Sequence, residues 1–205
     1  MSFAKILPLA IVMIAGPQIL SAIFLATSQS WRRNSAAYIL GAALSISLVV
    51  SVAYLLGNGA SDQGASDTTL YIIVLVLLVA AALHTFLTRK QPKDPPKWMG
   101  RLQTSDARLS FKLGFLLLGV FPTDILTSFA VGGYLASQDE PLWKFVPFLA
   151  LTLLFLAVPA LLIVAMGERA QTFLPKLRNW MGENSWVVNE IVLLLFIALT
   201  INNLT

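Results

Sequence analysis

Asp124 is the residue whose type and position suggest chemistry most clearly. It lies within an apolar stretch that reads Phe121-Pro122-Thr123-Asp124-Ile125-Leu126-Thr127-Ser128. In a helix, Thr127 and Ser128 would share a face with Asp124, because they follow it by three and four residues. A carboxylate within a bilayer costs at least about 2.5 kcal/mol and therefore faces protein or water. We expect Asp124 either to couple to a proton or cation or to hydrogen-bond between helices.

A second motif of the same kind occurs near the N-terminus. Gly16-Pro17-Gln18-Ile19-Leu20-Ser21 repeats the order of a proline, a polar residue and an Ile-Leu-hydroxyl triplet. Each proline leaves the carbonyl four residues earlier without its helical donor, so that a solute, water or cation could bind there. The alternative is that the prolines only bend their helices. The predicted substrate- or ion-binding residues are Pro17, Gln18, Ser21, Pro122, Thr123, Asp124, Thr127 and Ser128.

Other polar residues are weaker candidates. Glu190, with Asn189 beside it, is expected either to line a vestibule or to pair with a basic residue such as Arg169. Glu168 and Arg169 are expected to cap the preceding helix, with gating as the alternative. The chain has no cysteine and a single histidine. We therefore predict no metal site, no cofactor and no enzymatic activity.

Composition sets the environment in which these residues act. The 205 residues are 57% hydrophobic and 12% charged, with a mean hydropathy of +0.78, which is typical of an integral membrane protein. A chain in lipid must satisfy its own backbone polar groups, and long apolar runs favour helices over a barrel. The net charge of +4 comes from basic residues between apolar segments, so no nucleic acid partner is expected.

Six apolar segments are long enough to span a membrane, which takes about 20 residues. They predict an all-α membrane protein with six transmembrane helices. The first is too long for the core of a signal peptide and is expected to be retained. The predicted spans are Phe3 to Thr27, Ser35 to Leu56, Thr69 to Thr88, Ser110 to Tyr134, Leu142 to Met166 and Ser185 to Ile201.

Basic residues predict the orientation, because Lys and Arg accumulate on the cytoplasmic side. Twelve of the fourteen follow the first, third or fifth span, and only Lys5 and Lys144 do not. Both termini are therefore expected to be external. We treat residues 1–205 as a single membrane domain, in which a basic cytoplasmic connection at 89–109 separates two three-helix halves, 3–88 and 110–203. Three spans in each half would give the halves opposite orientations, as in inverted repeats.

Four stretches of the sequence carry a resemblance to a known family. They are Pro8 to Pro17, Trp31-Arg32-Arg33-Asn34, Pro95-Pro96-Lys97-Trp98-Met99 and Gly167-Glu168-Arg169. With them the chain resembles the small sulfolipid-addressing or glycopeptidolipid-addressing membrane proteins of the lysine-exporter superfamily. The family's fourth span often carries an Asn-Pro-Lys-Asn type motif, whereas this chain has Phe121-Pro122-Thr123-Asp124 there, which leaves the cargo open.

The resemblance implies a six-helix exporter in the cytoplasmic membrane. Its partners would be membrane lipids, a glycolipid or small-solute cargo, and either a lipid-export complex or further copies of itself. The alternative is a non-transporting accessory that uses its basic connection to hold a lipid-synthesis or export enzyme at the membrane. A membrane enzyme is the weakest option, because no nucleophile elbow or pair of histidines is present.

Overall fold

The computed structural model describes residues 3–14, 16–57 and 101–184, together with Leu87, Val187, Glu190, Leu194 and Ile197. All regular elements in this part of the chain are helices. The predicted third span, most of the sixth and the proline-rich part of the basic connection lie outside the described residues.

The first predicted span is divided into two helices, α1 (Phe3–Ile14) and α2 (Pro17–Ala26). Pro17 occupies the first turn of α2, where its missing N–H costs no helical hydrogen bond. Gly16 precedes it with φ 92 and ψ −133, a conformation that only glycine adopts without strain. The Gly-Pro pair therefore interrupts the helix rather than only bending it.

The fourth predicted span is also divided. Helix α6 (Ala107–Val120) ends at Phe121, and α7 (Pro122–Ser137) begins with a proline in its first turn. The two helices meet at an angle of 67°. Both proline motifs of the sequence thus start a new helix.

The longest apolar helices are α3 (Trp31–Gly57) and α8 (Val146–Met166), which follows the short 3-10 helix η2 (Leu142–Phe145). Among the described residues, Trp31–Gly57 and Leu142–Met166 are long and apolar enough to cross a membrane, and the bent pair α6–α7 is a third candidate. An all-helical membrane protein agrees with these findings. Six spans and two inverted repeats remain predictions.

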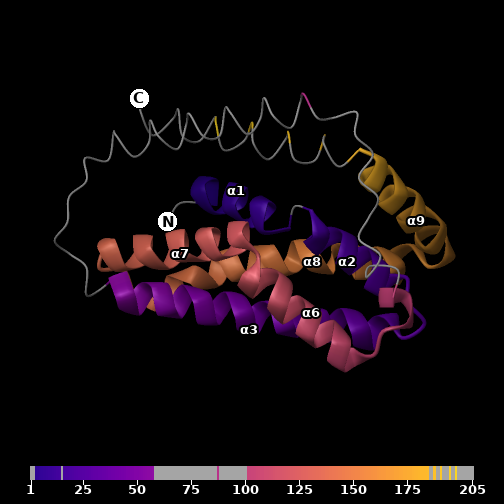
Figure 1. The fold of residues 1–205 in the computed structure, drawn as a ribbon, viewed down its shortest axis with the longest axis horizontal. Helices are drawn as coiled ribbons and strands as arrows, with labels where there is room; N and C mark the ends of the chain where they lie inside the picture. Colours follow the sequence, from indigo (N-terminus) through magenta and orange to yellow (C-terminus); the bar gives the residue numbers. More distant parts are fainter. Residues whose placement is uncertain are drawn as a thin grey trace.

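Helix α3 packs closely against α6 and α7 through glycines (Figure 1). A Cβ atom on Gly114 of α6 would lie 2.1 Å from the Tyr38 carbonyl oxygen, and one on Gly41 of α3 would lie 2.1 Å from that of Phe111. A Cβ on Gly132 of α7 would lie 2.4 Å from the Val50 carbonyl oxygen. Small residues are thus required for the backbones to approach this closely.

Helix α9 (Glu168–Glu183) follows α8 after Gly167, which has φ 56. The Gly167 N–H donates to the Ile163 carbonyl at 2.9 Å and so ends α8. Glu168 and Arg169 were expected to cap α8, but they are the exposed first residues of the next helix. The positive φ of glycine, rather than the charged pair, ends the helix.

Basic segments gather at one end of the described bundle. The end of α2, the starts of α3 and α6, the 3-10 helix η1 (Arg101–Thr104) and α9 lie there together (Figure 1). The acidic turn at Asp139 and Glu140 follows α7, whose end lies beside the end of α3 at the opposite side. This separation of charge is of the kind that the positive-inside rule requires, while the orientation itself remains a prediction.

Candidate functional site

The two helix breaks bring Gln18 and Asp124 into contact. Gln18 follows Pro17 in the first turn of α2, and Asp124 follows Pro122 and Thr123 in the first turn of α7. The Gln18 Nε2 atom donates a hydrogen bond to the Asp124 Oδ2 atom at 2.5 Å. Residues 106 positions apart in sequence thus form one polar contact.

Further polar side chains lie in the same buried region. Ser21 follows Gln18 by one turn of α2, and Ser128 follows Asp124 by one turn of α7. The hydroxyl of Tyr38 on α3 donates to the Gln18 backbone carbonyl at 2.9 Å. All of them are 0 or 1% exposed. We call Gln18, Ser21, Tyr38, Asp124 and Ser128 the central polar cluster.

Several atoms of this cluster have no hydrogen-bond partner within the described residues. They are Gln18 Oε1, Ser21 Oγ, Asp124 Oδ1 and Ser128 Oγ. Burying a polar group without a partner is unfavourable, and such atoms in a native structure call for an explanation. Two acceptors and two hydroxyls are therefore available for a polar group or a cation that enters the cluster.

Helix ends add to the electrostatics of the cluster. Helices α2 and α7 both begin beside it, and the N-terminus of a helix carries a partial positive charge. The preceding helices, α1 and α6, end at the same breaks, where their last carbonyls lack helical partners. Half-helices of this kind bind anionic groups at their N-termini and cations at their carbonyls in many transporters.

The other predicted binding residues contribute none of these unpartnered atoms. Thr127 is buried, but its hydroxyl donates to the Thr123 carbonyl within α7 at 2.7 Å. The Thr123 side chain is exposed, and Pro17 is half-buried. Pro122 forms the first residue of α7. The two prolines thus shape the helix starts, and the Thr123 side chain lies close to the Asp124 carboxyl group.

The predicted vestibule residues are not brought together by the described structure. Glu168 and Arg169 are exposed on α9, and Asn189 lies outside the described residues. Glu190 is half-buried, and its Oε2 atom has no hydrogen-bond partner among the described residues. No group of three or more His, Cys, Asp or Glu side chains suited to a metal ion occurs in the part of the chain that is described.

Tyr38 was missed in the sequence. Its signal was a phenol inside the first part of an apolar span, because a buried tyrosine hydroxyl requires a hydrogen-bond partner. The sequence showed that need but not which helix would meet it.

Asn34 was missed as a structural residue, although it belongs to the Trp-Arg-Arg-Asn stretch. Its Nδ2 atom donates to Ser28 Oγ and to the Ser105 carbonyl, both at 2.9 Å. The hydroxyl oxygens of Ser105 and Ser110 are 3.3 Å apart and share a hydrogen bond. Asp106 caps α6, because its side chain accepts a hydrogen bond from the Leu109 N–H. We call Ser28, Asn34, Ser105, Asp106 and Ser110 the junction network, because it joins the starts of α3 and α6.

Apolar helices of membrane-spanning length around a buried polar cluster define an all-helical membrane protein. The chain belongs to the family described as Sap, sulfolipid-1-addressing protein, whose family model matches residues 6–203. The resemblance to the sulfolipid-addressing proteins is thereby confirmed, whereas membership of the lysine-exporter superfamily stays a prediction. Comparison with curated proteins and with solved structures gives no match.

Proposed function

We propose that the protein is a transporter that exports a lipid, a glycolipid or a small amphiphilic solute across the cytoplasmic membrane. Family membership supports a role in a lipid-related membrane process. The observation that carries the proposal is the set of four polar atoms that are buried where two helices are broken and have no partner among the described residues. In the proposed arrangement both termini are external, the fold follows the lysine-exporter plan and no enzymatic step takes part.

The polar residues of the cluster divide among three proposed roles: ion coupling, cargo binding and positioning. Asp124 takes up and releases a proton or a cation at Oδ1, while Oδ2 keeps its hydrogen bond from Gln18. The Gln18 Oε1 atom and the hydroxyls of Ser21 and Ser128 bind polar groups of the cargo. Tyr38 holds the start of α2 through the Gln18 carbonyl and so positions the amide.

The buried state of the cluster implies that access requires movement. Its side chains are at most 1% exposed, so a cargo headgroup reaches them only when the surrounding helices separate. The breaks at Gly16 and Phe121 are the points where the backbone already changes direction. Hinges in transporters and enzymes are a few such element-terminal residues.

The test is export in a deletion strain complemented with wild type, Asp124→Asn or Gln18→Leu. The distribution of lipids and metabolites between cell surface and interior is compared without preselecting a compound. We expect wild type alone to restore a surface lipid or exported solute, with at least a tenfold loss in Asp124→Asn at equal protein level. Asp139→Asn is the matched control, because Asp139 is an exposed acid on the same helical hairpin, with φ 49, which asparagine also tolerates.

Full export by Asp124→Asn would contradict the proposal and favour the accessory function. The accessory alternative predicts that charge reversal at Lys93, Lys97 and Arg101 abolishes the phenotype while substitutions in the central polar cluster leave it intact. Measuring both sets of variants in one strain distinguishes the two functions.

A further inference from the structure

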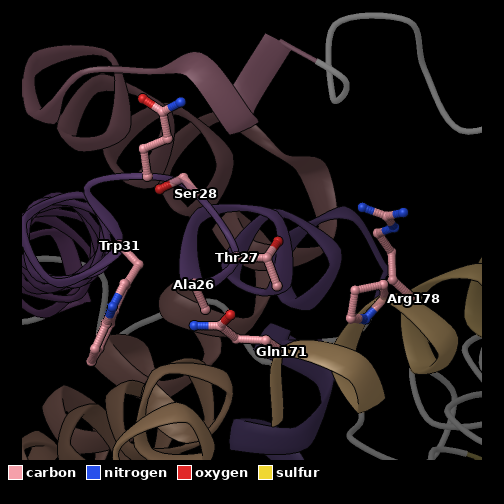
Figure 2. A pocket seen from close by; sticks show the side chains of 8 residues that line it. Ala26, Thr27, Ser28, Trp31, Gln171 and Arg178 are labelled. Carbon is pink, nitrogen blue, oxygen red and sulfur yellow. The ribbon is translucent and has the colours of Figure 1, made fainter. Parts of the chain in front are cut away.

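A recess of about 530 Å³ lies at the basic end of the described bundle, apart from the central polar cluster. It is formed by the end of α2, the turn that follows, the start of α3 and one side of α9. Trp31 and Arg178 flank it on opposite sides, with Thr27 and Gln171 between them (Figure 2). Its lining is therefore polar, with one cation and one indole ring.

Helix α9 lies across this end with one face buried. Ala170 and Leu174 are fully buried and pack against Ile23 of α2 and Ile163 of α8. The amphipathic sequence accounts for this, because its apolar residues recur at helical spacing.

Helix α9 also carries large apolar side chains that are exposed in the described structure. Phe173 and Trp180 are 48% and 50% exposed, and they lie seven residues apart on one side of the helix. Large apolar side chains on a polar helix beside membrane-spanning helices are typical of a segment that lies in the bilayer interface. This pattern favours an interfacial position for α9, while Gln171, Pro175 and Arg178, which line the recess, lie on the opposite side of the helix from Phe173 and Trp180.

Arg178 supplies the charge in the recess. Its Cζ atom lies 4.5 Å from the centroid of the Phe24 ring, and it donates through Nε and a terminal nitrogen to Asn179 Oδ1. The ion pair found within the described residues joins Lys144 and Glu140 at the other end of the bundle, so Arg178 has no carboxylate partner in that part of the chain.

The surroundings of the recess are also basic. Arg32 and Arg33 at the start of α3, and Arg169 and Lys176 on α9, are all exposed. Clusters of basic residues near a membrane surface attract anionic lipids. A guanidinium fork matches the oxygen atoms of a phosphate group in a bidentate manner.

From this geometry we infer that the recess between the α2–α3 turn and α9 binds the headgroup of an anionic membrane phospholipid. Arg178 holds the phosphate, Thr27 and Gln171 supply hydrogen-bonding groups beside it, and Trp31 packs along the glycerol region. Phe173 and Trp180 contact the acyl layer from the opposite side of α9 and keep the helix in the interface. The inference concerns a lipid that stays with the protein, and it holds whether or not the central polar cluster transports a cargo.

The test uses the full-length protein in detergent, titrated with phosphatidylglycerol and followed by native mass spectrometry and by thermal unfolding. We expect saturable binding of phosphatidylglycerol, at least fivefold weaker binding of phosphatidylcholine and no stabilisation by inorganic phosphate. Arg178→Gln should weaken phosphatidylglycerol binding at least fivefold. Lys176→Gln is the matched control, because it removes the same charge from an exposed position of α9 outside the lining, and it should change binding less than twofold.

Three outcomes would overturn the inference. Equal losses in Arg178→Gln and Lys176→Gln would show that net charge, rather than the recess, attracts the lipid. Stabilisation by inorganic phosphate alone would show a site for a soluble anion, and equal binding of phosphatidylcholine would show no preference for an anionic headgroup. Arg178→Lys keeps the charge without the fork, so it should fold as wild type does and show an intermediate affinity, which separates loss of binding from loss of folding.

Discussion

The central polar cluster and the junction network both join helices distant in sequence, but the central polar cluster is fully buried, whereas the junction network reaches the surface at Ser105 and Asp106, and the two differ in how many of their polar atoms have partners. In the junction network, the Asn34 amide nitrogen has two acceptors and the hydroxyls of Ser28, Ser105 and Ser110 donate to backbone carbonyls, so that one atom, Asn34 Oδ1, lacks a partner within the described residues. In the central polar cluster, four side-chain atoms lack a partner within the described residues. A network in which most polar atoms are paired stabilises a fold, whereas each buried atom without a partner costs stability, so the central polar cluster is the less favourable of the two regions.

Asn34→Ala should give the largest change in stability. It removes both hydrogen bonds from Nδ2 and leaves the Ser105 carbonyl without this donor, which costs about 2 to 3 kcal/mol. Thermal unfolding in detergent measures the effect, with the exposed Gln29→Ala as control. Export per folded molecule should stay near the wild-type level. A loss of export without a loss of stability would place Asn34 in the functional site and erase the contrast between the two regions.

Gly16→Ala should give the next largest change, about 2 kcal/mol, because a Cβ atom strains a residue with φ 92. A steric clash does not contribute to this destabilisation, since the nearest atom to the added Cβ is Gln18 Oε1 at 3.5 Å. Gly133→Ala is the matched control, because it lies within α7 with no atom within 4 Å of its added Cβ, and it should be neutral or slightly stabilising. Equal unfolding temperatures for the two variants would contradict a strained break at Gly16.

Ser21→Ala and Ser128→Ala should give the smallest change in stability, within about 0.5 kcal/mol of wild type or slightly stabilising. Each removes a buried hydroxyl that has no partner in the described structure, so little favourable interaction is lost. Export should nevertheless fall in both, in contrast to Asn34→Ala. Destabilisation by 2 kcal/mol or more would reveal a hydrogen bond that serves the fold, and the central polar cluster would then resemble the junction network.

The sequence predicted the helical class and the main span boundaries well where hydrophobicity alone decides them. The fifth predicted span, Leu142 to Met166, has the same limits as η2 with α8, and the second differs from α3 by a few residues at its N-terminal end. Hydropathy could not place α9, because its polar composition hides an apolar face that packs only in the tertiary structure.

The candidate site was predictable in part. The paired proline motifs identified Gln18 and Asp124, since an amide and a carboxylate inside apolar helices need polar surroundings. Tyr38 could not be assigned to the same site, because its partner is a backbone carbonyl of α2, which no pattern of side chains reveals. The role of Gly167 in ending α8 was obscured by the charged residues after it, which suggested a cap of their own.

The glycine contacts between α3 and α6 have a mechanical consequence. At Gly41 and Gly114 the backbones meet with no side chain between them that could yield by changing rotamer. The contact between α3 and α6 is therefore rigid. The other side of the central polar cluster is bounded by α1 and α2, two short helices separated at Gly16. We therefore expect movement to occur in α1 and α2 rather than in α3 and α6. Spectroscopic probes of motion belong on α1 and α2, and reference probes belong on the outer faces of α3 and α6.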